Sequence, residues 1–319
     1  MGRPLVLGQA TAQRKQSMIN DNIVDIGSAW SSDKVSGIVQ GRNVLHNWDF
    51  RDPVNQWGLN EYDSGGTHLY TVDRWLVAPG ATVMLFPGKG IRIERTGSQS
   101  RWSQFIQRLE RGFLLAGKTV TVSAEIRTRD FEGFVSHTAK FPSDFGPAFD
   151  FTVGIPFPGT DGYRFNFIKM AGASSLVNFR IFPNGDLPFG TFIEVGRVKL
   201  ELGTVSTLLN DPPMDFGREL AVCQRYQFVF NNAFVVRASA WSGNVFWFDI
   251  PVPTTMRVNP TINATPNIER NAGTVETGFA VSAPAAHPHR ISFSATRTGH
   301  GMTDAFMRIL AGTVLDANL

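Results

Sequence analysis

The chain has 319 residues, which is enough for two domains of ordinary size that each bury a core. A hydrophobic content of 42% with 18% charged residues excludes a wholly disordered chain, and no apolar run approaches the roughly 18 residues that suggest a membrane span. The formal net charge of +3 is weak and the basic residues are scattered, so we expect neither a nucleic-acid partner nor membrane insertion.

The residue counts also limit the kinds of site. Cys223 is the only cysteine, which excludes an intrachain disulfide and a multi-cysteine zinc site, and we expect a buried, inert thiol. The composition has 31 Gly, 26 Phe and 18 Pro, with few strong helical patterns. This mixture predicts many short strands joined by turns.

Residues 1–42 are polar over much of their length and could not bury a core by themselves. Because isolated polar termini fray, we expect this N-terminal arm to be held by a partner chain or by copies of itself, as an anchoring and oligomerisation segment. The apolar stretch at the N-terminus is too short for a secretory signal, so we expect synthesis in a cytosol.

Residues 43–212 are aromatic and rich in turns, which predicts an antiparallel β-sandwich of the jelly-roll type. The clearest strand is Thr119–Arg127, in which apolar and polar residues alternate. The segment from Ser103 to Arg111 fits either a helix or a strand. The other predicted strands are Ala81–Phe86, Gly90–Arg95, Phe149–Ile155, Tyr163–Lys169, Leu176–Phe182 and Thr191–Leu202.

The spacing of apolar residues changes at the end of this region. Apolar alternation reverses its phase near Gly196, which predicts a β-bulge. After Pro212-Pro213, apolar residues at i, i+4 and i+7 predict a short linker helix over about 215–226, with Asp215 as its N-cap. We expect its apolar stripe to couple the domains by docking on the C-terminal sandwich or on a neighbouring subunit; the stripe comprises Phe216, Leu220 and Cys223.

Residues 213–319 repeat the strand-and-turn character and predict a second β-sandwich. Phe246-Trp247-Phe248 places aromatic residues on both faces of one strand, which is typical of a central strand or of a strand at a subunit interface. The predicted strands are Ala233–Ala238, Asn244–Ile250, Thr261–Ala264, Phe279–Ser282, Ile291–Ala295 and Phe306–Ala311.

Several segments resemble a jelly-roll module of bacteriophage and prophage structural proteins. They are Asn43-Val44-Leu45-His46-Asn47-Trp48-Asp49-Phe50, Pro53-Val54-Asn55-Gln56, Tyr70-Thr71-Val72-Asp73-Arg74-Trp75, Val198-Lys199-Leu200-Glu201-Leu202-Gly203 and Arg218-Glu219-Leu220-Ala221-Val222-Cys223-Gln224-Arg225-Tyr226. The arm segment Ala29-Trp30-Ser31-Ser32-Asp33-Lys34 is similar to a short motif that often precedes such modules in tail-fibre proteins. The pattern departs at Trp57-Gly58, where the module usually has Arg-Gly. The motifs are specific to this class of proteins and not to one task.

The resemblance implies a virion component that is made in the host cytoplasm. It implies a homotrimer with carbohydrate-binding-like sandwiches, and we expect the arm to contact other virion proteins. The first hypothesis is a tail fibre or receptor-binding subunit that attaches to host surface glycan through many weak sites. The alternative is a head or neck fibre or decoration protein with a mechanical role. An exported carbohydrate-binding module is disfavoured because no catalytic region or signal is found.

No catalytic constellation rises above chance, so we expect a non-enzymatic protein without cofactor or metal. His287-Pro288-His289 supplies two close imidazoles without a third ligand, and Gly88-Lys89-Gly90 is typical of a hairpin turn and not of a phosphate loop. Nothing in their spacing marks the loop carboxylates Asp144, Asp150 and Asp161 as the pair that glycoside hydrolysis requires.

Aromatic residues give the better indication of a ligand, because sugars stack their apolar faces on exposed rings while polar side chains bind their hydroxyls. Trp48, Phe50 and Trp75 lie in the resembling motifs and are expected in the core. The candidate ligand-binding residues lie in turn-rich contexts; they are Trp57, Tyr62, Trp102 and Trp241, with Tyr70 as a further possibility.

Overall fold

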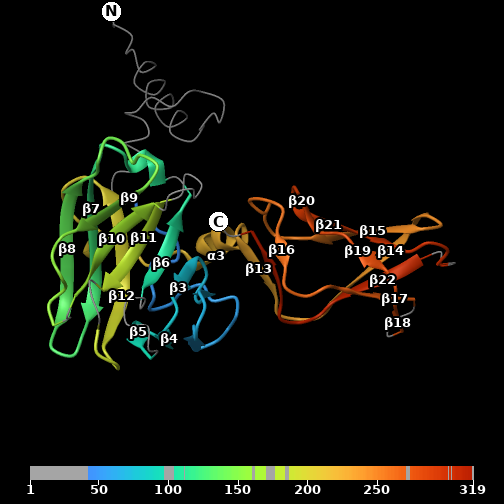
Figure 1. The fold of residues 1–319 in the computed structure, drawn as a ribbon, viewed down its shortest axis with the longest axis horizontal. Coiled ribbons are helices and arrows are strands. Elements are labelled where there is room, and N and C mark those ends of the chain that lie inside the picture. The colour runs from blue at the N-terminus through green and yellow to red at the C-terminus, as the bar shows by residue number, and fades with distance from the viewer. Residues whose placement is uncertain are drawn as a thin grey trace, which may run out of the picture. The chain divides into compact units, whose positions relative to one another are not determined.

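The computed structural model describes residues 42–96, 104–110, 112–159, 162–169, 177–183, 187–270, 274–300, 302 and 304–317. The arm predicted over 1–42 lies outside these residues except for Arg42. The described chain is nearly all β, with one α-helix, and its sheets are antiparallel (Figure 1). The predicted fold class, an all-β protein of sandwich type with a short helix between its two β regions, is confirmed.

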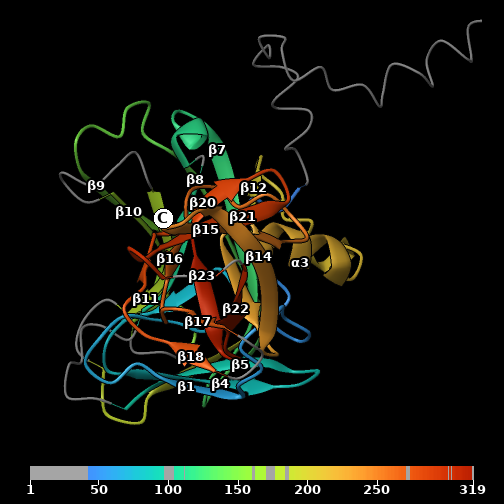
Figure 2. The same cartoon turned by 90° about the vertical axis from the view of Figure 1, so that its right-hand side faces the viewer.

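The first β region contains two six-stranded sheets that enclose one core. The strand order is β1-β4-β5-β12-β7-β8 in one sheet and β2-β3-β6-β11-β10-β9 in the other, and Figure 2 shows β1, β4 and β5 together at the edge of the first. The bounds are β1 Glu61–Asp63, β2 Leu69–Tyr70, β3 Trp75–Val77, β4 Ala81–Phe86, β5 Gly90–Arg95, β6 Phe105–Leu109, η2 Gly112–Leu115, β7 Thr119–Arg127, β8 Glu132–Lys140, β9 Phe149–Val153, β10 Tyr163–Lys169, β11 Val177–Pro183, β12 Phe192–Leu202 and η3 Leu208–Asn210.

The long strand β12 lies in the middle of its sheet and carries the predicted bulge. Its register with β7 shifts between Val195 and Arg197, at Gly196. As a result Val195 and Val198 both face the core and are fully buried, which the alternating pattern alone would not allow. The segment Ser103–Arg111, which the sequence left open between helix and strand, contains strand β6.

The turn between β4 and β5 is the predicted hairpin at Gly88-Lys89-Gly90. Gly88 and Gly90 have φ of 76° and 134°, values that L side chains rarely adopt. A Cβ atom on Gly90 would lie 2.2 Å from the carbonyl oxygen of Val195, so the close approach of β5 to β12 requires glycine at this position.

The second β region contains a three-stranded sheet, β13-β23-β16, and an eight-stranded sheet, β18-β17-β22-β14-β15-β21-β19, in which β20 also pairs with β21. The bounds are β13 Gln227–Phe230, β14 Phe234–Ser242, β15 Val245–Pro251, β16 Thr261–Ile262, β17 Asn267–Glu269, β18 Val275–Glu276, β19 Ala280–Val281, β20 Ala285–His287, β21 Arg290–Thr296, β22 Asp304–Ile309 and β23 Thr313–Asp316. Its core is separate from the first and begins at Phe230 in the sequence.

The linker helix α3 spans Phe216–Gln224, and the carboxylate of Asp215 accepts a hydrogen bond from the backbone N–H of Arg218. The predicted N-cap is therefore confirmed. Within the described residues no helix has the length and apolar character needed to cross a membrane.

Candidate functional site at the junction of helix α3 and strand β13

Three of the motif segments, at residues 43–50, 53–56 and 70–75, meet in one buried cluster of hydrogen bonds, and the segment at residues 29–34 lies outside the described residues. Asn47 has a φ of 51°, is fully buried, and its side-chain amide donates to the carbonyl oxygens of Val54 and Asp73 at 2.8 Å. Its side-chain oxygen accepts from the N–H of Val54 at 2.7 Å. The indole N–H of Trp75 donates to the carbonyl oxygens of His46 and Asn47. This hydrogen-bonded cluster therefore fixes the loops at residues 46–47, 54 and 73–75 relative to one another.

Helix α3 and the residues that follow it contact this hydrogen-bonded cluster and its neighbours. The backbone N–H of Asn47 donates to the Glu219 carboxylate at 2.6 Å. The guanidinium of Arg74 lies 3.5 Å from the ring centre of Tyr226, whose hydroxyl donates to Glu110. Burial is the main cause that raises the pKa of Tyr226 to about 12. These polar contacts join the helix to the first sandwich, whereas docking of its stripe on the C-terminal sandwich or on a neighbouring subunit stays a prediction.

The predicted stripe on the helix does not act as one surface. Cys223 is fully buried, and its burial raises the pKa of the thiol well above its ordinary value. Leu220 is half-buried, whereas Phe216 has 43% of its surface exposed. Of the three, only Cys223 is therefore buried, and the other two residues line the edge of a cleft.

Gln56 links the hydrogen-bonded cluster to strand β13. Its side-chain amide donates to a carboxylate oxygen of Asp73 at 3.1 Å and to the carbonyl oxygen of Gln227 at 2.8 Å. Its side-chain oxygen accepts from the N–H of Val229 at 3.4 Å. Burial raises the pKa of Asp73 to about 7, although the two hydrogen bonds from Gln56 act in the opposite direction.

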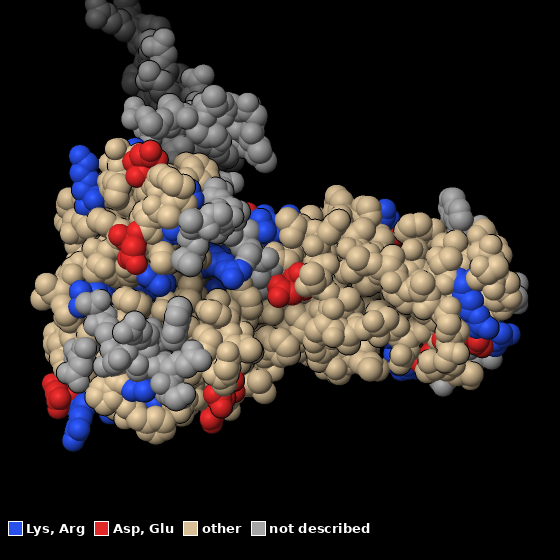
Figure 3. Space-filling view, in the orientation of Figure 1, with Lys and Arg blue, Asp and Glu red and all other residues tan. Residues whose placement is uncertain are grey.

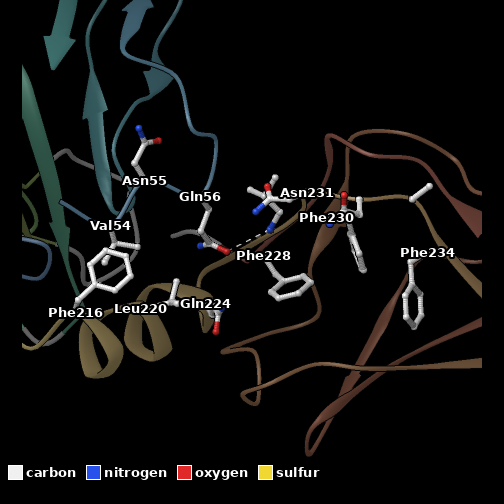
Figure 4. A pocket seen from close by; sticks show the side chains of 13 residues that line it. Val54, Asn55, Gln56, Phe216, Leu220, Gln224, Phe228, Phe230, Asn231 and Phe234 are labelled. Carbon is white, nitrogen blue, oxygen red and sulfur yellow. Dashed lines mark hydrogen bonds between the residues drawn. The ribbon is translucent and has the colours of Figure 1, made fainter. Parts of the chain in front are cut away.

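A cleft of about 460 Å³ lies beside this link (Figure 4). Gln224, Asn231 and Asn232 contribute side-chain amides that form no hydrogen bond within the described part of the chain. Among the described residues, no ionisable side chain lines the cleft. The lining residues are Val54, Asn55, Gln56, Phe216, Leu220, Gln224, Phe228, Val229, Phe230, Asn231, Asn232, Ala233 and Phe234. The cleft therefore suits an uncharged ligand.

The predicted aromatic ligand-binding residues do not converge. Tyr62 is 3% exposed and lies in the core, because strand β1 turns its ring inward. Its hydroxyl donates to Asn55. The prediction that Tyr62 exposes its ring to a ligand is therefore wrong. Trp57 is half-buried, and its indole N–H is buried without a partner within the described residues. Trp102 lies outside the described residues, and Trp241 lies in β14 with its side chain outside the description.

Among the tryptophans whose side chains the structure describes, the exposed one is Trp247, on the solvent face of the eight-stranded sheet. It has 52% of its surface exposed, while its neighbours Phe246 and Phe248 are fully buried. Ser294 of β21 lies opposite it in the register, so a small side chain leaves the indole uncovered on that side. On the next outward position, the Asp249 carboxylate accepts from Ser292 and lies 3.4 Å from Arg290.

Comparison with known proteins adds no assignment. No protein-family model matches the chain, and no curated protein and no solved structure is significantly similar to it. The described residues contain no group of three or more His, Cys, Asp or Glu side chains that could hold a metal ion. The face of the molecule in Figure 3 shows acidic and basic side chains interspersed, with wide uncharged areas between them.

Proposed function

We propose that the protein is a non-enzymatic structural component of a bacteriophage virion, a homotrimeric tail fibre or receptor-binding subunit that attaches to host surface glycan. The observation that carries this proposal is the half-exposed indole of Trp247 on the solvent face of the eight-stranded sheet. The motif resemblance supports a location in the virion and a homotrimeric state. The buried hydrogen-bonded cluster gives the motif residues a structural role.

The chemistry around Trp247 suits a saccharide. An indole face offers a flat apolar surface for the C–H groups of a sugar ring, and the short Ser294 side chain leaves that surface open on one side. Asp249, with 53% of its side chain exposed, can accept hydrogen bonds from sugar hydroxyls, and the Arg290 guanidinium can donate them. A single site of this kind is weak, and three copies in a trimer would give avidity.

Binding of the full-length protein to arrays of bacterial surface polysaccharides tests the proposal. Trp247→Ala is expected to lower binding at least tenfold without changing the oligomeric state. Val235→Ala is the matched control, because it removes another exposed apolar side chain from the same sheet. Loss of the trimer in Trp247→Ala would assign the indole to a subunit interface. Absence of glycan and cell binding by the unaltered protein would favour the head or neck decoration protein.

A further inference from the structure

Strand β13 is the edge strand of its sheet, and its open side faces the cleft. Tyr226 accepts a hydrogen bond from the N–H of Ala317, so residues 226, 228 and 230 direct their backbone groups to β23. Residues 227 and 229 therefore direct theirs to the opposite side. The contacts of Gln56 agree, because it binds the carbonyl oxygen of Gln227 and the N–H of Val229 from that side.

The side-chain amide of Gln56 imitates one residue of a parallel strand. In a parallel ladder, one residue donates its N–H to the carbonyl of residue i−1 and accepts from the N–H of residue i+1 of its neighbour. Gln56 makes this pair of hydrogen bonds to Gln227 and Val229. The next position of the same ladder consists of the Val229 carbonyl and the Asn231 N–H, which have no partner within the described residues.

We propose that the cleft binds an extended peptide segment of a partner protein, which adds to β13 as a parallel strand at the Val229 carbonyl and the Asn231 N–H. Both residues line the cleft, and Figure 4 labels Gln56 and Asn231 among the side chains around it. The two backbone groups give hydrogen bonds that do not depend on sequence. This inference is independent of glycan binding at Trp247.

The walls of the cleft define the composition of the peptide. Phe216 with 43% exposure and half-buried Phe228 and Phe234 offer apolar contacts for alternate side chains. Because the described lining has no ionisable side chain, a charged peptide would lose hydration without gaining an ion pair. We therefore expect an uncharged segment of β-branched and small polar residues, with a volume of three or four residues inside the cleft.

A capped pentapeptide of alternating threonine and valine is a suitable probe, compared with the same peptide N-methylated at its first residue, because Gln56 occupies the ladder position on the N-terminal side. Titration of the full-length protein is expected to show binding that N-methylation weakens about tenfold, the effect of one lost hydrogen bond. Hydrogen exchange in the unaltered protein should show that the unmethylated peptide protects the Asn231 N–H. Equal binding of the two peptides, or no binding at millimolar concentration, would overturn the proposal.

Two substitutions at one position separate backbone from side-chain recognition. Asn231→Pro removes the N–H and should weaken binding at least tenfold, whereas Asn231→Ala keeps the N–H and should bind within about twofold of the unaltered protein. Asn232→Ala is the control at the neighbouring position of the cleft. Equal losses in Asn231→Ala and Asn231→Pro would assign recognition to the side-chain amide, as for a saccharide, and would contradict strand addition. Thermal melting verifies that each variant is folded.

Discussion

The ammonium nitrogen of Lys199 lies 2.6 Å from each carboxylate oxygen of Asp211, although the Lys199 side chain is fully buried. Lys199 lies on the outer face of β12, and the loop that contains η3 covers it there. Glu201, 1% exposed, lies 3.6 Å from the same nitrogen and accepts from Thr207. The buried charges therefore hold the chain that leads from the first sandwich to helix α3.

Substitution Lys199→Met should be strongly destabilising. It removes the cation and leaves the carboxylates of Glu201 and Asp211 beneath the loop without their charge partner, a change that costs about 3–5 kcal/mol in buried pairs. Urea denaturation measures the free energy of unfolding. The control is Arg237→Met, which breaks the exposed pair with Asp304 and should cost less than about 1 kcal/mol. Equal costs for the two variants would contradict this account.

The stability of the protein should depend on pH through Asp73. Its pKa rises from 3.8 to about 7 on folding, so the folded chain keeps a proton that the unfolded chain releases. The free energy of unfolding should therefore fall as the pH rises from about 4 to about 7, by at most about 4 kcal/mol from this group, and then level off.

Asp73→Asn isolates this effect from other carboxylates. Asparagine at position 73 does not titrate, so the difference in the free energy of unfolding between the unaltered protein and Asp73→Asn should change between about pH 4 and about pH 7 and stay flat above it. Urea midpoints across this range are the measurement. A difference that does not vary with pH would show that Asp73 is ionised normally.

The sequence predicted the elements whose patterns are local. Thr119–Arg127 alternates over its whole length, and the structure gives β7 the same bounds. The bulge at Gly196 and the cap at Asp215 were also predicted, since each depends on residues close in sequence. The strand β8 was missed because most of its residues are exposed or half-buried and give no apolar signal.

The candidate site could be predicted only in part. β1 has three residues, too few for a period that would place Tyr62 in the core. The aromatic run of β15 indicated two apolar faces, but it did not show that Ser294 would lie beside Trp247. The link from Gln56 to Gln227 joins residues 171 positions apart, and no local pattern contains such a contact. Contacts between residues far apart in the sequence therefore determine where the candidate site forms.

The β4–β5 hairpin gives a matched pair of glycine substitutions. In Gly90→Ala the new Cβ would meet the Val195 carbonyl oxygen at 2.2 Å, and the φ of 134° is itself unfavourable, so we expect a loss of more than about 3 kcal/mol. Gly88→Ala has open space around the Cβ and a φ of 76°, and should cost only about 1–2 kcal/mol. Thermal unfolding of both variants decides whether strand contact or backbone conformation dominates.

The last prediction concerns the link between Gln56 and β13. Gln56→Ala removes the hydrogen bonds to Asp73, Gln227 and Val229, and should lower the free energy of unfolding by about 1–3 kcal/mol. The Val229 N–H loses its partner, so its hydrogen exchange should accelerate more than that of the β7 amides.

Asn55→Ala is the control for this variant, because the Asn55 side chain binds Gly58, Leu59 and Tyr62 and makes no described hydrogen bond to β13. Its exchange at Val229 should match that of the unaltered protein. Amide exchange followed by mass spectrometry or NMR resolves the two cases. If Val229 remains protected in Gln56→Ala, another group must pair with this edge of β13, and the free ladder position beside it would be in doubt as well.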